Sequence, residues 1–300
     1  MMDAAERDAL VIGSGVHRYR FERNWARLPR GWLFRDADPL TKPPRIVSTG
    51  AVAANGEVFV LSRSAHPVVV FDPDGNFITS WGEGQFSEFV HGLSIAPNGN
   101  VWITDSGWHI VTEHAPTGEK LRTLGRRNFP APTFYGEPFN MPTEVAFASN
   151  GDVYVSDGYG NRRVHRFSAA GELLHSWGAP GDGPGQFAIV HFIAIDEQDR
   201  VWITDRDNHR IQIFDAGGSF LAEWKEFRMP SDLAFGRDRI YVGGQDGLSI
   251  WTRERELVVR WDRDDPYKGA FHIHGLWLDA AENIYLAQFD HMVSKLTRVS

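Results

Sequence analysis

Residues 92–105 read GLSIAPNGNVWITD, and residues 144–157 repeat the same pattern as EVAFASNGDVYVSD. In both, a short apolar run leads into a turn rich in Asn and Gly and then into a second run that ends at an acid, which is typical of a β-hairpin. Related stretches recur at 50–62, 192–205, 232–244 and 275–288. A repeat period of about 40 residues is typical of propellers and solenoids. The chain is therefore predicted to be built from copies of one structural unit.

Several units continue past the hairpin into two further strand-like runs, the last of which ends in Trp. These continuations are VVVFDPDGNFITSWG at 68–82, VHRFSAAGELLHSWG at 164–178 and IQIFDAGGSFLAEW at 211–224. Four strands in each repeat form the blade of a β-propeller. The sequence therefore predicts an all-β fold, a six-bladed β-propeller whose blades occupy residues 46–300.

The two ends of the chain are predicted to meet in one blade. The last unit has only three strand-like runs, and residues 19–25, YRFERNW, show the alternation and final Trp of the other fourth strands. We therefore expect this N-terminal strand to complete the last blade, which leaves no unpaired edge at the seam of the ring. Residues 1–300 then form a single propeller domain, with residues 1–18 as an N-terminal extension.

Composition limits the classes of partner. The 300 residues contain 31 Lys and Arg against 39 Asp and Glu, a formal net charge of −8, and no basic run of the kind that follows a phosphate backbone, so no nucleic acid is expected. The chain shows neither an export signal nor an apolar run of the roughly 20 residues that a membrane helix needs, so we expect a cytoplasmic protein with no membrane contact. Without Cys, thiolate ligands and a Cys nucleophile are excluded. Nothing in the sequence indicates a protein partner.

Histidine recurs at one position of the repeat. Aligning the first strand of each unit on its apolar core gives, in order, Thr49, His91, Thr143, His191, Ser231 and His274. First strands line the central channel of a propeller, so three imidazoles from alternate blades are expected to converge on its axis. Three imidazoles without a thiolate suit zinc best, although iron, cobalt and manganese accept the same ligands. Three protein ligands leave a coordination position open, as in catalytic zinc sites.

The repeat itself resembles a known family. The spellings NRRVHRF after Asp157 and NHRIQIF after Asp205 resemble the NHL repeat. From about Tyr19 onward, the chain resembles the peptidyl-α-hydroxyglycine α-amidating lyases, which are six-bladed NHL propellers. The matching segments are SRSAHP at 62–67, VHGLSI at 90–95, SDGYGNRRV at 156–164, VHFIAI at 190–195, DRDNHRI at 205–211 and IHGLWL at 273–278.

The resemblance implies roles for individual residues. His91, His191 and His274 match the family's zinc ligands. Arg63 lies in the segment of the family's essential arginine and is expected to hold a substrate carboxylate through two parallel hydrogen bonds. Tyr159 matches the catalytic tyrosine and is expected to act as a base, because a dication and an arginine beside a phenol favour its ionised form.

Three more residues are weaker candidates for substrate binding. Arg206 occupies the same position in its unit as Arg63, His66 follows Arg63 by three residues, and His272 stands where the family has an apolar residue that lines the site. The family also follows its last zinc ligand with an acid that helps to hold a structural calcium. Here that residue is Gly275, which argues against calcium.

Together these features predict a metal-dependent carbon–nitrogen lyase. As the resemblance implies, it cleaves an α-hydroxylated amide that also carries a carboxylate, and it releases glyoxylate or a similar carbonyl product. Two alternatives stay open. One is a metal-dependent hydrolase such as a lactonase, since propellers host those as well, and the other is a non-enzymatic NHL scaffold that binds proteins. Lactonase sites usually rely on carboxylate ligands, and a scaffold has no need of alternating histidines. A measurement of bound metal therefore distinguishes the lyase, the hydrolase and the scaffold.

Overall fold

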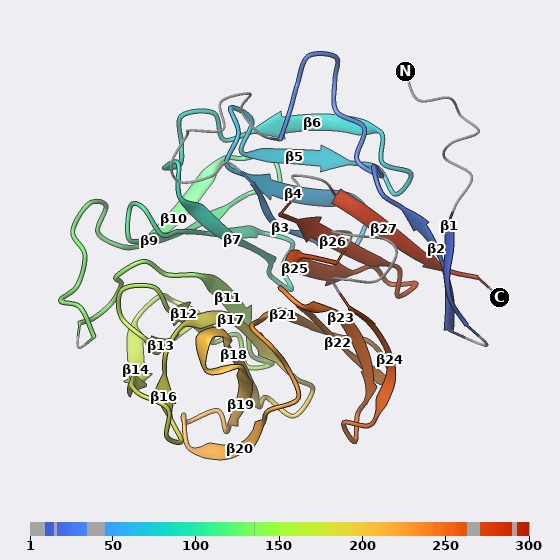
Figure 1. Cartoon of the computed structure of the whole chain (residues 1–300). Helices are drawn as coiled ribbons and strands as arrows, with labels where there is room; N and C mark the ends of the chain where they lie inside the picture. Colours follow the sequence, from blue (N-terminus) through green and yellow to red (C-terminus); the bar gives the residue numbers. More distant parts are fainter. Residues whose placement is uncertain are drawn as a thin grey trace.

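The computed structural model describes residues 10–14, 17–34, 46–134, 136–262, 271–289 and 293–299. The described residues form six antiparallel sheets of four or five strands, arranged as blades around a common axis (Figure 1). A parallel pair of two-residue strands and the short 3-10 helix η2 (Arg206–Asn208) lie in the connections. The predicted all-β, six-bladed propeller is confirmed.

In blades 1 to 5, the first strand lies nearest the channel and the later strands follow outward in chain order. Blade 1 contains β3 (Val47–Val52), β4 (Val58–Ser62), β5 (Val68–Phe71) and β6 (Phe77–Trp81); blade 2 contains β7 (Val90–Ile95), β8 (Val101–Asp105), β9 (Ile110–His114) and β10 (Lys120–Gly125); blade 3 contains β11 (Glu144–Phe147), β12 (Val153–Asp157), β13 (Arg163–Phe167) and β14 (Leu173–Trp177). Blade 4 follows the parallel pair β15 (Ala179–Pro180) and β16 (Gln186–Phe187), and contains β17 (Val190–Ile195), β18 (Val201–Asp205), β19 (Arg210–Phe214) and β20 (Phe220–Trp224). Blade 5 contains β21 (Pro230–Phe235), β22 (Arg239–Gly244), β23 (Gly247–Thr252) and β24 (Leu257–Asp262).

Blade 6 joins the two ends of the chain. Its strands are β25 (Ile273–Leu278), β26 (Ile284–Gln288), β27 (Val293–Arg298), then β2 (His17–Glu22) and β1 (Leu10–Ser14). Phe21 of β2 pairs with Leu296 of β27, which confirms that an N-terminal strand completes the last blade (Figure 1). That strand spans 17–22 where the sequence predicts 19–25, so it begins two residues earlier and ends three residues before Trp25. In addition, β1 adds a fifth strand from within the expected extension. Residues 1–9 of that extension lie outside the described residues.

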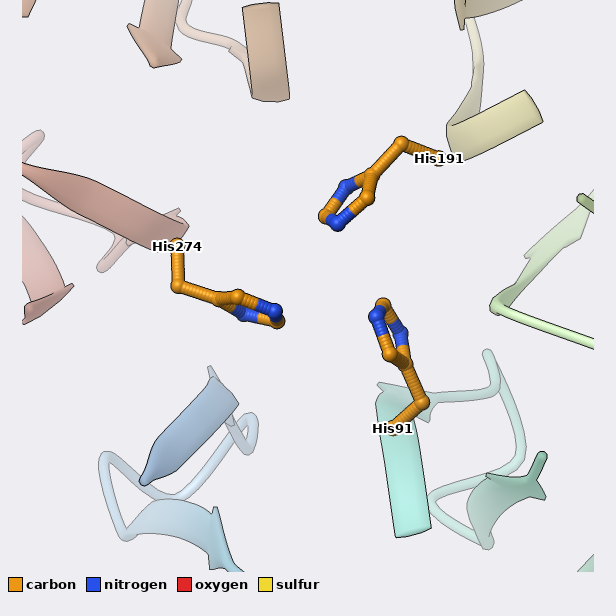
Figure 2. A group of neighbouring side chains, drawn as sticks. All are labelled: His91, His191 and His274. Carbon is orange, nitrogen blue, oxygen red and sulfur yellow. The ribbon is translucent and has the colours of Figure 1, made fainter. Parts of the chain in front are cut away.

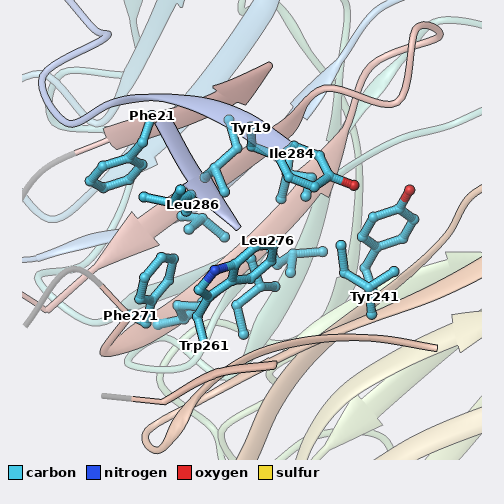
Figure 3. Close-up of a cluster of buried hydrophobic side chains, with 13 residues drawn as sticks. Tyr19, Phe21, Tyr241, Trp261, Phe271, Leu276, Ile284 and Leu286 are labelled. Carbon is cyan, nitrogen blue, oxygen red and sulfur yellow. The ribbon is translucent and has the colours of Figure 1, made fainter. Parts of the chain in front are cut away.

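The apolar core is divided among the contacts between blades. Figure 3 shows the cluster between blades 5 and 6, in which Tyr19 and Phe21 of the N-terminal strand pack with Trp261, Phe271 and Leu276. Burying apolar surface contributes about 25 cal/mol per Å², so each such contact ties one blade to the next. The closed ring thereby fixes the first strands, and the side chains at their starts, relative to one another.

A β-bulge shapes the start of the first strand. In five blades the register between first and second strands shifts by one residue at this point, which leaves one residue unpaired. The bulged residues are Ser48, His91, His191, Ser231 and His274. In blade 3 the corresponding residue, Thr143, comes directly before β11.

The bulge corrects one position of the sequence alignment. Thr49 pairs with Leu61 as Gly92 pairs with Thr104, so Ser48, and not Thr49, is the counterpart of His91. Because Ser48 also carries a hydroxyl group, the alternation of histidine with a hydroxyl residue around the ring is unchanged.

Candidate metal centre

Three imidazoles meet at the axis of the ring (Figure 2). The ring centroids of His91, His191 and His274 are 5.0, 5.0 and 5.1 Å apart, which is nearly an equilateral triangle. One nitrogen of each ring lies within 4.8 Å of the other two, and all three side chains are buried. Among the described residues, this is the only group of His, Cys, Asp or Glu side chains close enough together to hold a metal ion.

Each imidazole is oriented by the backbone of the following odd-numbered blade. Every Nδ1 lies 2.7–2.9 Å from a carbonyl oxygen: His91 pairs with Thr143, His191 with Ser231 and His274 with Ser48. A carbonyl oxygen only accepts, so Nδ1 donates and Nε2 keeps its lone pair. A bond of this kind from the outer nitrogen fixes the tautomer and ring orientation of metal-binding histidines in proteins.

Burial keeps these rings neutral. It lowers the pKa of His91 and His191 well below the usual value, and the neighbouring imidazoles add to the effect. Burial and the charge of Arg63 lower the pKa of His274 to about 3. Among the described residues, the buried Nε2 of His191 has no hydrogen-bond partner, which costs about 1–3 kcal/mol. A divalent cation bound by the three lone pairs removes that cost, so the residues present fit a metal ion.

Glycine allows two of the blades to approach the carbonyls that orient their own histidines. A Cβ atom on Gly92 would lie 2.4 Å from the carbonyl oxygen of Thr143, and one on Gly275 would lie 2.6 Å from that of Ser48. Any side chain at position 275 would therefore require a shift of the backbone.

Tyr159 lies next to this centre, on the loop between β12 and β13. Its hydroxyl oxygen is 3.0 Å from Nε2 of His91, and its ring meets the rings of His91 and His191 edge-on. The resemblance implies that nearby cations favour the phenolate. Among the groups that the structure describes, burial has the largest effect and raises the pKa of Tyr159, although Arg206 and Arg63 lower it. When no metal is bound, the phenol is therefore protonated near neutral pH and donates to Nε2 of His91, the nitrogen that a metal ion would occupy instead.

Arg63 also lies close enough to the centre for its charge to lower the pKa of His91 and His274. It is buried, its Nε donates to the carbonyl oxygen of Val90 at 3.0 Å, and its guanidinium lies 4.3 Å from the ring centroid of Phe89. Burial lowers its pKa to about 10, so it stays charged. Within the described ranges its two terminal nitrogens have no hydrogen-bond partner.

Two of the three weaker candidates lie near the same group. Arg206 is 5.7 Å from the ring centroid of Tyr159, and the phenol helps to raise the pKa of Arg206 against the opposing effect of burial. His272 is stacked on Phe289 at 4.2 Å, and it lowers the pKa of His274.

The third weaker candidate is oriented differently. His66 is bonded to Glu83 at 3.0 Å and stacked on Trp32 at 3.3 Å. These contacts hold the imidazole of His66 among residues of blade 1 and the N-terminal segment, so the structure does not bring it to the centre.

Two buried acids that the sequence analysis did not single out directly follow the hydroxyl residues Thr143 and Ser231 at the channel end of blades 3 and 5. Glu144 accepts hydrogen bonds from Ser94 and from the backbone N–H of Val145, and burial raises its pKa to about 7. Asp232 accepts one from the N–H of Leu276, and its other oxygen is buried with no partner in the part of the chain that the structure describes. Burial raises the pKa of Asp232 well above the usual value. The sequence feature that could have identified them is an acid directly after the hydroxyl residue in a strand that is otherwise apolar.

Comparison with known proteins supports the assignment of the repeat. The NHL repeat family model matches residues 139–167 and 187–214. Human NHL repeat-containing protein 3 is 30% identical over 239 residues, which cover 75% of this chain and 67% of that protein. Peptidyl-alpha-hydroxyglycine alpha-amidating lyase 1 of Drosophila melanogaster is 35% identical over 249 residues, 71% of this chain and 44% of its own. A probable lyase of the same name from Caenorhabditis elegans is 35% identical over 50% of this chain and 43% of its own length. The chain thus spans less than half of these two lyases.

Solved structures share the architecture. A streptogramin B lyase superposes with a TM-score of 0.65 at 15% identity, over 93% of this chain and 97% of its own. A gluconolactonase from Xanthomonas campestris gives 0.66 at 14% identity, over 98% and 93%. At such identities the likeness shows the fold alone. None of the described helical segments is long and apolar enough to cross a membrane.

The repeat, the ring and the extent of the match to human NHL repeat-containing protein 3 together show that this protein belongs to the NHL-repeat family of β-propellers.

Proposed function

We propose that this protein is a zinc-dependent lyase that cleaves the carbon–nitrogen bond of an α-hydroxylated amide and releases glyoxylate or a similar carbonyl product. The observation that carries the proposal is the group of three neutral imidazoles at the axis, each oriented by a carbonyl, with Arg63 and Tyr159 beside them. The 35% identity to proteins named as amidating lyases supports the choice of reaction.

His91, His191 and His274 would hold the zinc through the nitrogens that face the axis. Bound zinc supplies a Lewis acid that makes a nearby hydroxyl group more acidic. Three protein ligands leave room for such a group. The described residues offer no carboxylate to this centre, which favours the lyase over a lactonase that relies on carboxylate ligands.

Arg63 positions the substrate. Its guanidinium is held by Val90 and Phe89 through Nε and one face, so its terminal nitrogens remain available to a carboxylate. Two parallel N–H bonds then fix both the position and the plane of that carboxylate. Arg206, near Tyr159, adds a second positive charge, so the centre selects anionic substrates.

Tyr159 is placed to move the proton. In the reaction, the carbon–nitrogen bond breaks with its electron pair going to nitrogen, the hydroxyl carbon becomes a carbonyl, and the hydroxyl proton is transferred to the nitrogen. The phenol oxygen lies beside the centre, and burial raises its pKa while Arg206 and Arg63 lower it. The charge of a bound dication would add to that of the two arginines and favour the phenolate that accepts this proton.

The test is direct. Zinc-loaded protein incubated with α-hydroxyhippurate should release glyoxylate and benzamide in equal amounts, while hippurate, which lacks the hydroxyl group, should be inert. Oxygen from labelled water should not enter the amide product; labelled benzoate would instead identify a hydrolase. His175→Ala, at an exposed position on β14, serves as the control for His191→Ala. No release above the background decay of the substrate, from neutral to mildly alkaline pH, contradicts the proposal for this substrate.

A further inference from the structure

A second histidine lies behind the carbonyl that orients His91. That carbonyl belongs to Thr143, which follows Met141 and Pro142 in the connection that enters blade 3. The backbone N–H of Met141 donates to Nδ1 of His109 at 3.1 Å. His109 is the last residue of the turn between β8 and β9 in blade 2, the blade that also supplies His91. One hydrogen bond therefore ties the segment with the orienting carbonyl to the blade with the metal ligand.

The same arrangement recurs two blades further round the ring. In blade 5, Met229 and Pro230 precede Ser231, whose carbonyl oxygen accepts from Nδ1 of His191. The N–H of Met229 donates at 3.1 Å to Nδ1 of His209, the last residue of the turn between β18 and β19. Blade 4 thus supplies both the metal ligand and the second histidine, as blade 2 does. We call His109 and His209 the outer histidines.

The backbone at both hydrogen bonds has a conformation that needs support. The angle φ is 59° at His109 and 66° at Met141, and it is 57° at His209 and 53° at Met229. Positive φ is uncommon for residues other than Gly, and a residue before Pro prefers an extended backbone. Such conformations persist where surrounding contacts hold them. Loss of the hydrogen bond to an outer histidine should therefore loosen the segment that leads into the orienting carbonyl.

The outer histidines and the metal ligands have opposite tautomers. A backbone N–H only donates, so Nδ1 of each outer histidine accepts and the proton lies on Nε2. In His91 and His191, Nδ1 donates to the carbonyl and Nε2 keeps its lone pair. An imidazole that loses its carbonyl partner is free to move its proton to Nε2. That nitrogen then has no lone pair for a metal ion.

We propose that the outer histidines are positioning residues of the metal centre, each of which acts on one ligand: His109 on His91, and His209 on His191. The inference rests on the metal centre of the proposed function but not on its reaction. Each outer histidine holds a carbonyl where that carbonyl selects the Nδ1–H tautomer of one ligand. The carbonyl of Thr143 also accepts from the hydroxyl group of Thr104 at 2.8 Å, so removing His109 should displace only part of the His91 population.

Nitrogen NMR of the metal-free full chain, labelled with ¹⁵N-histidine, tests this pairing. The wild type should show His91, His191 and His274 as Nδ1–H tautomers, with each signal assigned by its loss in the single Ala variant. His109→Ala should convert part of the His91 population to the Nε2–H tautomer and leave the other two ligands unchanged. His209→Ala should do the same to His191 alone.

Replacement by Asn is the matched rescue. Oδ1 of Asn is bonded to Cγ, as Nδ1 of His is, so it can accept the same hydrogen bond, and Asn tolerates positive φ better than most residues. His109→Asn and His209→Asn should therefore restore the tautomers that the Ala variants lose. His175→Ala, at an exposed position on β14, should match the wild type.

Zinc affinity provides a second readout, measured by competition with a chelator. It should fall in proportion to the fraction of the ligand that keeps the Nδ1–H tautomer, so a fraction of about one third means a loss of about threefold. The Asn variants should bind zinc as the wild type does. Urea unfolding of each metal-free variant, measured in parallel, separates these effects from a general loss of stability.

Outer histidines that serve only the fold would change the free energy of unfolding and leave both the tautomers and the zinc affinity unaltered. That result overturns the inference, as do equal changes at all three ligands or Asn variants that behave like the Ala variants. The predicted pairing of tautomers in a protein that binds no zinc supports the positioning role and contradicts the zinc-dependent function. Paired effects on zinc affinity without cleavage of α-hydroxyhippurate contradict the reaction on that substrate alone.

Discussion

Even-numbered and odd-numbered blades have the same strand order but contribute differently to the centre. Blades 2, 4 and 6 place a histidine at the start of the first strand, whereas blades 1, 3 and 5 place Ser48, Thr143 and Ser231 there. The backbone carbonyls of those odd-blade residues orient the imidazoles. The centre thus needs both kinds of blade: the even blades supply the side chains and the odd blades supply the acceptors that fix them.

The next residue along the strand differs as well. In even blades 2 and 6 it is Gly92 or Gly275, which lets the strand approach the neighbouring carbonyl. In odd blades 3 and 5 it is Glu144 or Asp232, whose carboxyl groups are buried and have raised pKa values. At one and the same strand position, a glycine therefore lets the backbone approach a neighbouring carbonyl in even blades 2 and 6, whereas an acid is buried in odd blades 3 and 5.

Removing an even-blade imidazole should have the largest effect. His91→Ala, His191→Ala and His274→Ala each delete one of three ligands, so zinc affinity should fall by more than the roughly 10–100-fold typical of altering only the groups that support a ligand. Competition with a chelator of known affinity measures this loss. His175→Ala should match the wild type, and an unchanged affinity in any of the three ligand variants would remove that histidine from the metal centre.

Changing the groups beside the centre should reduce turnover and leave zinc in place. Arg63→Ala should lower kcat/KM by about 100-fold or more, because the variant loses a charged double hydrogen bond to the carboxylate, and Arg63→Lys should recover only part. Tyr159→Phe should act mainly on kcat, since it removes the group that moves the proton. Steady-state kinetics with parallel zinc analysis separates these roles. Loss of zinc in Arg63→Ala or Tyr159→Phe would show that these side chains support the metal instead.

The buried acid of blade 3 should make stability depend on pH. The pKa of Glu144 rises from 4.5 in the unfolded chain to about 7 in the folded one, so the folded state holds the extra proton between these values. Its contribution to stability is complete below the unfolded pKa and is lost as pH rises through the folded pKa. Relative to the wild type, Glu144→Gln should therefore gain on the order of 3 kcal/mol between about pH 5 and about pH 8.

Urea unfolding of the metal-free protein measures this difference without the contribution of zinc binding. The matched control is Glu172→Gln, in an exposed turn of the same blade. A difference between Glu144→Gln and the wild type that does not change with pH contradicts the raised pKa.

The smallest effect concerns an odd-blade hydroxyl group. Ser48 donates from Oγ to the carbonyl oxygen of His91, and its own carbonyl accepts the bond from His274. Ser48→Ala removes the first bond and keeps the second, so it should lower the free energy of unfolding by about 1 kcal/mol without changing zinc content. Loss of zinc in this variant would mean that the hydroxyl group, and not the backbone, determines the geometry.

The repeat of about 40 residues was enough to predict the blades of the fold and the three histidines of the metal centre. Repeats with apolar alternation identify the blades, and the histidines stand out because they share a position in every second unit. The sequence did not show that Ser48, one residue before Thr49, is the counterpart of His91, because a bulge shifts register without leaving a mark in residue type. His66 and Arg63 stand in one motif, yet only Arg63 faces the centre, because the contacts of His66 to Glu83 and Trp32 come from distant segments.

The central claim is that one metal ion binds the three histidines of the even blades. X-ray absorption at the zinc edge, combined with elemental analysis, tests it on the zinc-loaded full chain and on the triple variant His91→Ala, His191→Ala, His274→Ala. The account predicts about one zinc per chain with three imidazole nitrogens and one oxygen at about 2.0–2.1 Å, and no zinc in the triple variant. A wild type that carries no zinc, or a triple variant that keeps it in the same surroundings, would contradict the account.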